Sequence, residues 1–187
     1  MNREAWTVAV RAHQRGFTLV ELIVVIVIAG ILAAVAAGRM VSPDEFAAKS
    51  YADQVDSLLR FGQKTAIAQN RDVWVRVGSS GVALCYTSGC TTGNRVIAPG
   101  GRNSGTSETS TVCGDASWAC EAPGRGMSVS AAVALFYFDP LGKPFALGDY
   151  SASSPPTASI FNTLTVTVTH SGRSRSVVVE QETGYVH

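Results

Sequence analysis

The sequence predicts an α+β protein, in which one long N-terminal α-helix precedes a head built on a mainly antiparallel β-sheet. Residues 17–37 form an unbroken apolar run that contains a single charged side chain. Residues 44–70 place apolar side chains at steps of three and four, which is the period of an amphipathic helix. Residues 73–187 alternate apolar and polar side chains between turns, as strands do. Because helix and strand segments do not interleave, an alternating βαβ fold is excluded.

The first 16 residues are predicted to be a leader peptide. Its three arginines outweigh its one acidic residue, Glu4. This positive balance favours retention of the leader on the cytoplasmic side of a membrane, with the head, residues 44–187, sent outward. An ordinary secretory signal is cut after its apolar region, whereas this basic segment ends at Gly16, before the apolar run.

Residues 17–43 are predicted to form a transmembrane helix. At 1.5 Å per residue, about 20 helical residues span roughly 30 Å, the thickness of a bilayer core. Glu21 is the one charge in the apolar run. A carboxylate inside a bilayer costs about 2.5–3.5 kcal/mol, so we expect Glu21 to have a partner. Proline lacks an N–H donor, so Pro43 is expected either to kink a continuous helix or to start a new one.

The stretch Gly16-Phe17-Thr18-Leu19-Val20-Glu21 resembles the N-terminus of type IV prepilins and type II secretion pseudopilins. The motif of that family is a glycine, then Phe-Thr-Leu-x-Glu, then an unbroken apolar helix. The resemblance implies cleavage after Gly16 by prepilin peptidase and methylation of the new amino terminus at Phe17. It also implies that Glu21 pairs with the Phe17 amine of a neighbouring subunit during assembly. A generic signal anchor with a chance glutamate is the alternative.

The same resemblance implies where the protein resides and what it contacts. It would be a single-pass inner-membrane protein with its head in the periplasm, and later a subunit of a pilus or pseudopilus. The apolar helix, residues 17–43, would serve first as membrane anchor and then as filament core. The implied partners are other major and minor pilins, prepilin peptidase and the inner-membrane assembly platform.

The head resembles the GspH/FimT group of pseudopilins. The features that carry this resemblance are the run 60–71 leading into a valine-rich strand, the turn at 138–144 and a terminal hairpin ending at 183–186. The cysteine-bearing insertion and the run 63–69 resemble more narrowly the minor pilins of mannose-sensitive haemagglutinin-type pili. The resemblance implies a minor pilin or pseudopilin that initiates or caps assembly of a type IV pilus or a type II secretion pseudopilus.

All four cysteines lie in a Gly-, Ser- and Thr-rich part of the head. An even count in an exported domain predicts two disulfides. Three pairings are possible, and the local one, Cys85 with Cys90 and Cys113 with Cys120, is favoured because each bond closes a short loop at low entropic cost. A zinc site is the alternative, although neither spacing is Cys-x-x-Cys.

No arrangement of residues indicates catalysis. His13 lies in the leader, His170 in a turn and His187 at the end of the sequence, and none is near a nucleophile motif. Asp139 and Asp149 lie near serines but lack the alternating oxygen ligands of an EF-hand, so solvated turns are favoured over a calcium loop. We therefore expect no enzymatic activity, no cofactor and no metal.

A different function is indicated by Gly172-Arg173-Ser174-Arg175 at the start of a predicted strand. Arginines at alternate positions of a strand project on the same side, where they can clamp phosphate oxygens. The run matches a Gly-Arg-x-Arg motif of FimT-like minor pilins that act in DNA uptake, so a DNA-binding minor pilin is the alternative function. The net charge of +1 gives no general support for nucleic-acid binding, and basic residues at hairpin ends are commonly only solubilising.

Overall fold

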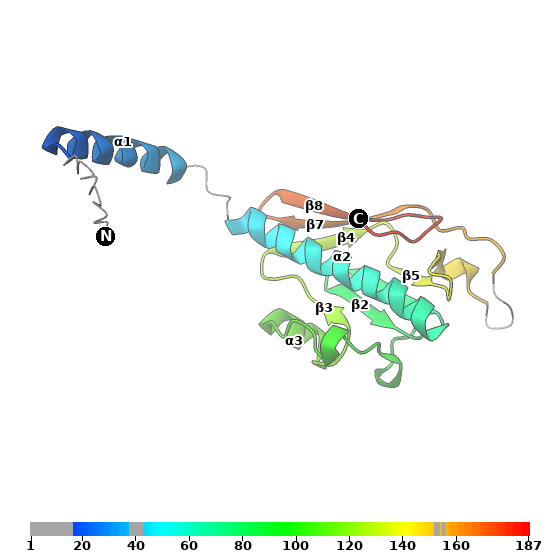
Figure 1. Cartoon of the computed structure of the whole chain (residues 1–187). Coiled ribbons are helices and arrows are strands. Elements are labelled where there is room, and N and C mark those ends of the chain that lie inside the picture. The colour runs from blue at the N-terminus through cyan, green and yellow to red at the C-terminus, as the bar shows by residue number, and fades with distance from the viewer. Residues whose placement is uncertain (1–16, 38–42, 152–153, 155) are drawn as a thin grey trace, which may run out of the picture. The chain divides into compact units, whose positions relative to one another are not determined.

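The computed structural model describes residues 17–37, 43–151, 154 and 156–187 (Figure 1). The chain forms two compact units, residues 1–41 and residues 42–187, each of which is described by itself. The leader, with Gly16, and residues 38–42 of the predicted transmembrane helix lie outside the described residues.

Within residues 17–37, the described part of the first unit, the chain forms the helix α1 (Leu19–Ala37). The first described helix of the second unit is α2 (Pro43–Gln69). Residues 38–42 lie outside the described residues, so the kink or new helix start expected at Pro43 stays a prediction. None of the helices in the described part of the chain combines the length and the apolar character that crossing a membrane requires. The membrane span predicted over residues 17–43 therefore stays a prediction.

The amphipathic helix predicted over residues 44–70 corresponds to α2. Asp44 and Glu45 lie in its first turn, where carboxylates interact favourably with the helix dipole. One stripe of α2 is buried, and it consists of Ala48, Tyr51, Ala52, Val55, Leu58, Leu59 and Ala66. The steps of three and four between these residues place them on the face that contacts the sheets.

Two antiparallel sheets follow α2. The five-stranded sheet has the order β3-β2-β1-β5-β6, and the three-stranded sheet has the order β4-β7-β8. The strands are β1 (Val73–Gly78), β2 (Gly81–Cys85), β3 (Cys120–Glu121), β4 (Met127–Ala131), β5 (Leu135–Phe138), β6 (Pro144–Ala146), β7 (Leu164–His170) and β8 (Arg173–Val179). The predicted α+β class, a helix followed by antiparallel strands, is confirmed.

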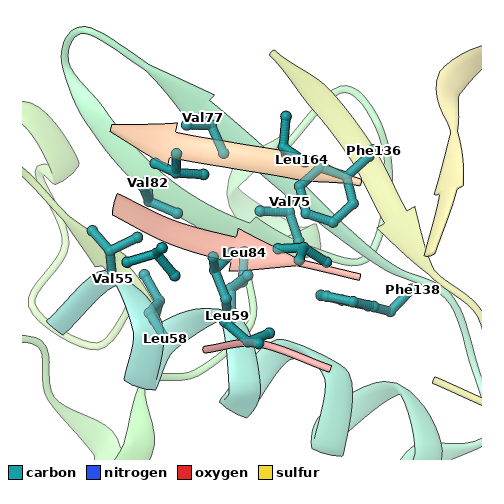
Figure 2. Packing of buried hydrophobic residues seen from close by; sticks show 14 of the residues in the cluster. Val55, Leu58, Leu59, Val75, Val77, Val82, Leu84, Phe136, Phe138 and Leu164 are labelled. Atoms are coloured by element: carbon teal, nitrogen blue, oxygen red, sulfur yellow. The ribbon is translucent and has the colours of Figure 1, made fainter. Parts of the chain in front are cut away.

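The main core lies between α2 and the inner faces of both sheets (Figure 2). Val55 and Leu59 of α2 are fully buried with Val75 of β1, Leu84 of β2 and Leu164 of β7. Burying a side chain of this size contributes roughly 1.5–3 kcal/mol. The core therefore holds the helix and the two sheets together as one unit.

A second, smaller core lies on the outer face of the five-stranded sheet. Side chains alternate between the two faces of a strand, so Trp74 and Tyr137 point away from α2. Their ring centroids are 4.6 Å apart, and Phe145 stacks on Tyr137 at 5.5 Å. Burial, followed by the negative charge of Asp72, raises the pKa of Tyr137 to about 12.

The insertion between β2 and β4 contains a short helix, α3 (Ser107–Cys113), and the strand β3. Neither element was predicted, because the Gly, Ser and Thr content of this region indicates loops. The hydroxyl of Tyr51 in α2 donates a hydrogen bond of 3.0 Å to the carbonyl oxygen of Glu121 in β3. Burial, with the nearby Glu121 charge, raises the pKa of this phenol above its usual range. This contact ties the insertion to α2.

The fold predicts that Gly81 is irreplaceable, whereas Gly78 at the other end of the same turn is not. Gly81 has φ of +135°, and a Cβ there would collide with the carbonyl oxygen of Glu121. A Cβ at Gly78 meets no heavy atom within 4 Å. We expect Gly81→Ala to lower the free energy of unfolding by about 2 kcal/mol or more, and Gly78→Ala to change it by less than about 1 kcal/mol. Urea melts of the two variants in detergent measure this, and equal losses would contradict the packing at Gly81.

Candidate functional site

The N-terminal end of α1 is a capped helix start. The side-chain oxygen of Thr18 accepts a hydrogen bond from the backbone N–H of Glu21 at 3.2 Å. The Thr18 carbonyl oxygen accepts the first helical bond from Leu22 N–H, also at 3.2 Å. Glu21 is thus the third helical residue, where the helix dipole favours a negative charge. Sequence reasoning missed the role of Thr18, although the spacing Thr-x-x-Glu is the signature of a capping box.

Apolar side chains surround α1 on every side. All of its described side chains are exposed, and the large ones range from 47% for Ile23 to 74% for Leu19. A helix without a polar face belongs inside a membrane, a protein core or a bundle of helices, because water does not tolerate so large an apolar surface. Phe17 and Glu21 lie at the exposed N-terminal end of this surface. The arrangement offers a packing surface with one carboxylate and performs no chemistry by itself.

The second candidate site is the hairpin of β7 and β8. Ser171 and Gly172 form its two-residue turn with φ of 49° and 76°, as a type I′ turn requires. Arg173 and Arg175 lie on the same side of β8, as expected of alternate strand positions. This is also the side on which Val177 is buried, so the arginines continue the face of the sheet that α2 covers.

Arg175 is held by an acidic partner. Its Nη2 lies 2.5 Å from Oε1 of Glu45 in the first turn of α2. Next to this ion pair, His170 Nδ1 lies 3.3 Å from the carbonyl oxygen of Asp44 and 3.9 Å from Oδ1 of the same residue. The two acidic side chains therefore offset the positive charge at this end of the hairpin. Sequence reasoning missed the role of Glu45, because it lies 130 positions away from Arg175 along the chain.

Arg173 differs from Arg175. The ion pairs among the described residues do not include it, and its side chain is exposed. The structure therefore places the two arginines on one side of β8 but does not leave both available to a phosphate.

The four cysteines form two disulfides that connect neighbouring parts of the insertion. Cys85 is bonded to Cys90, with 5.3 Å between the Cα atoms, and Cys113 is bonded to Cys120, with 6.0 Å between them. This is the local pairing that the spacing favours. Both bonds are buried in the outer core beside Trp118.

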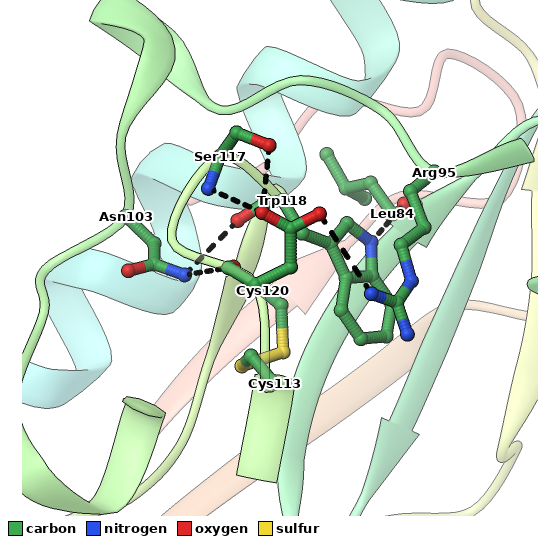
Figure 3. A network of polar contacts seen from close by, with 8 residues as sticks. Leu84, Arg95, Asn103, Cys113, Ser117, Trp118 and Cys120 are labelled. Carbon is green, nitrogen blue, oxygen red and sulfur yellow. Dashed lines mark hydrogen bonds and ion pairs between the residues drawn. A yellow bond between two sulfur atoms is a disulfide. The ribbon is translucent and has the colours of Figure 1, made fainter. Parts of the chain in front are cut away.

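A polar network fixes Trp118 in this core (Figure 3). Its indole N–H donates to the carbonyl oxygen of Leu84 at 2.8 Å, and the guanidinium of Arg95 lies 4.2 Å from the ring centroid. Arg95 also lies 3.8 Å from a carboxylate oxygen of Asp115. Hydrogen bonds from Ser117, assisted by Arg95, lower the pKa of Asp115. The network has a structural role, since its polar groups bind one another.

Asp139 and Asp149, which were considered as ligands of a calcium loop, accept hydrogen bonds from backbone N–H groups. Oδ1 of Asp139 accepts hydrogen bonds from the N–H groups of Leu141 and Lys143, at 2.9 and 2.8 Å. Asp149 accepts a bond of 2.9 Å from the N–H of Ala146. Among the described residues, no group of three or more His, Cys, Asp or Glu side chains is placed to hold a metal ion. Both aspartates have a local role in their turns.

Comparison with protein families finds one match, which covers the N-terminal segment of the chain. The family described as the prokaryotic N-terminal methylation motif matches residues 11–37. This range covers the predicted cleavage position, the Thr18 cap, Glu21 and the whole of α1. The segment 11–37 is therefore similar to the N-terminal segments of that family.

Two solved structures are similar to this chain, and both are crystal structures of the type IV minor pilin FimU from Pseudomonas aeruginosa strain PAO1. The first, in space group P21, is 12% identical with a TM-score of 0.46, and the match covers 75% of this chain and 86% of that chain. The second, in space group P65, is 13% identical with a TM-score of 0.43, and the match covers 74% and 90%. The comparison with curated proteins gives no match.

The outer core predicts a measurable contribution of the disulfides to the stability of the head. Replacing Cys113 and Cys120 together by alanine removes a cross-link that closes a short loop. We expect the free energy of unfolding to fall by about 2–3 kcal/mol. Thermal melting of this variant beside the unaltered protein measures the loss. An unchanged melting temperature would contradict the role given to this bond.

Proposed function

We propose that this protein is a minor pilin or pseudopilin, a subunit that initiates or caps assembly of a type IV pilus or of a type II secretion pseudopilus. One observation carries the proposal. The methylation motif at residues 11–37 includes a capped helix whose described side chains are all exposed. The position at the start or tip of the filament is supported by the sequence resemblance of the head to the GspH/FimT group.

In this proposal, assembly is the whole mechanism. Prepilin peptidase cuts after Gly16 and frees an amine on Phe17, and methylation of that amine leaves its positive charge in place. The apolar helix holds the subunit in the inner membrane with the head in the periplasm. The assembly platform then transfers it into a bundle of helices from other major and minor pilins, where apolar surface is buried again.

Glu21 would set the register between neighbouring subunits. An unpaired carboxylate is costly in an apolar bundle, and a charged amine at Phe17 of a neighbour removes this cost. The Thr18 cap fixes where α1 begins, and with it the spacing between this amine and the carboxylate. Charge pairing therefore permits only helix arrangements that bring the Phe17 amine of one subunit next to Glu21 of its neighbour.

A DNA-binding minor pilin is the second candidate function. The exposed Arg173 at the hairpin supports it. The ion pair between Arg175 and Glu45 weakens it, because one of the two proposed phosphate ligands already has a carboxylate partner.

The first prediction concerns processing. We expect the mature protein to begin at Phe17 and to carry a methyl group on its amine, which mass spectrometry of the purified protein determines. Gly16→Ala should block the cut without changing the stability of the head, since the cut lies outside that unit. A chain that still begins at Met1, or that is cut beyond Ala37, would contradict the pilin assignment.

The second prediction concerns Glu21. We expect Glu21→Val to reduce filament number or secretion output at least tenfold, because the neighbouring amine loses its partner, and to favour retention in the membrane. Glu21→Gln is the matched control for side-chain size. It should reduce filament number or secretion output as well, since glutamine carries no charge. The melting curve of the head should be unchanged in both variants, and normal assembly of either would show that the carboxylate is dispensable.

The third prediction tests DNA contact. If the hairpin binds DNA, the protein should bind a duplex weakly, without sequence preference and less tightly as salt rises, through counterion release. Arg173→Gln combined with Arg175→Gln should abolish binding, and Glu45→Gln should strengthen it by freeing Arg175. Titration of labelled duplex at low and moderate salt measures both effects. Absence of binding at low salt, or equal binding by the double variant, would remove this candidate.

A further inference from the structure

The outer edge of β8 carries backbone groups that have no partner along half of the strand. β8 is the edge strand of the three-stranded sheet. At its far end, the N–H of Val178 donates to the carbonyl oxygen of His187 at 2.7 Å, and His187 N–H donates back at 3.0 Å. Because backbone groups alternate between the two sides of an antiparallel strand, Ser174 and Ser176 also direct their N–H and C=O groups outward. Among the described residues, nothing is bonded to these four groups.

A trough lies between this edge and α2. Its volume is about 490 Å³, and it is lined by Ala52, Asp53 and Arg60 on one side and by Arg175, Ser176 and Val177 on the other. The segment 185–187 of the chain itself already lies along the same edge in extended form. Its Val186 is fully buried, and its carbonyl oxygen accepts a hydrogen bond of 3.1 Å from Arg60 Nε. At its C-terminal end, at Val178 and Val179, the edge therefore already pairs with extended backbone.

The charges along residues 173–177 of β8 indicate which kind of partner fits this edge. A second copy of this chain pairing edge to edge in antiparallel fashion, centred on Arg175, would set two Arg175 side chains opposite each other, and like charges there are destabilising. A nucleic acid would bring many phosphates close to Asp44, Glu45 and Asp53. An extended peptide with a single carboxylate opposite Arg173 meets neither obstacle.

We propose that residues 173–177 of β8 accept an extended strand from a partner protein. Backbone groups of the partner would exchange hydrogen bonds with Ser174 and Ser176. The partner would place a carboxylate opposite Arg173 and a small apolar side chain opposite Val177, at the trough. This inference goes beyond the proposed function and concerns the head alone, so it does not depend on processing or on Glu21.

The test uses the full chain in detergent micelles and two labelled seven-residue peptides. In the first, threonine alternates with glutamate, alanine and valine, and the second has the reverse order, so that antiparallel and parallel addition are both sampled. We expect one of them to bind, and its affinity to fall at least tenfold when the backbone nitrogens that face β8 are methylated. Hydrogen exchange at Ser174 and Ser176 should slow when that peptide is bound.

Variants of the protein supply the matched comparison. Ser176→Pro removes an N–H that points outward, so the bonds to β7 are kept while the added strand is blocked. Ser176→Ala changes only the side chain and should bind as the unaltered protein does. Arg173→Gln should weaken binding of the glutamate peptide but not of a glutamine version.

Three results of the binding experiments would overturn the proposal, and a fourth result concerns self-association. These are failure of both peptides to bind, equal binding of the methylated peptide, and preferential binding of a 12-base-pair DNA duplex at the same residues. A concentration-dependent dimer that Ser176→Pro abolishes would likewise assign the edge to a second copy. Because Gly16→Ala should bind the peptide normally, failure here is distinguishable from failure of the pilin assignment.

Discussion

The packing of one face of α2 against both sheets is the contact on which the head depends. Among the described residues, no strand of the five-stranded sheet pairs with a strand of the three-stranded sheet. Helix α2 contacts β1, β7 and β8, and Val55 and Leu59 are fully buried between them. A sheet of three strands needs an apolar partner to be stable in water. Without α2, both sheets would lose the surface that covers them.

Helices α1 and α2 differ in where their apolar side chains lie. In α2 these side chains form one stripe, so the helix completes a core within its own head. In α1 they lie on all sides and are exposed, and in the proposed function a membrane or the helices of other subunits cover them. In the proposed assembly, the single carboxylate, Glu21, is the residue that would distinguish one arrangement of neighbours from another. Folding and assembly thus depend on separate segments of the chain.

The sequence predicted the parts of the structure that depend on local patterns. The period of residues 44–70, the alternation in β7 and the spacing of the cysteines all lead to what the structure shows. It did not predict α3 or β3, because tertiary contacts such as the bond from Tyr51 to Glu121 stabilise an insertion that has little local preference. The pairing of Arg175 with Glu45 was inaccessible for the same reason. A same-side placement of two arginines follows from strand period, but their partners follow from the fold.

The central claim is that α1 leaves the membrane and is buried among the helices of other subunits. Photo-crosslinking from a single position in the middle of α1, at Ile26, tests this most directly. The account predicts products with the apolar helices of other pilins in isolated filaments or pseudopili, and lipid products alone when the assembly machinery is inactive. Lipid products alone in both conditions would contradict it.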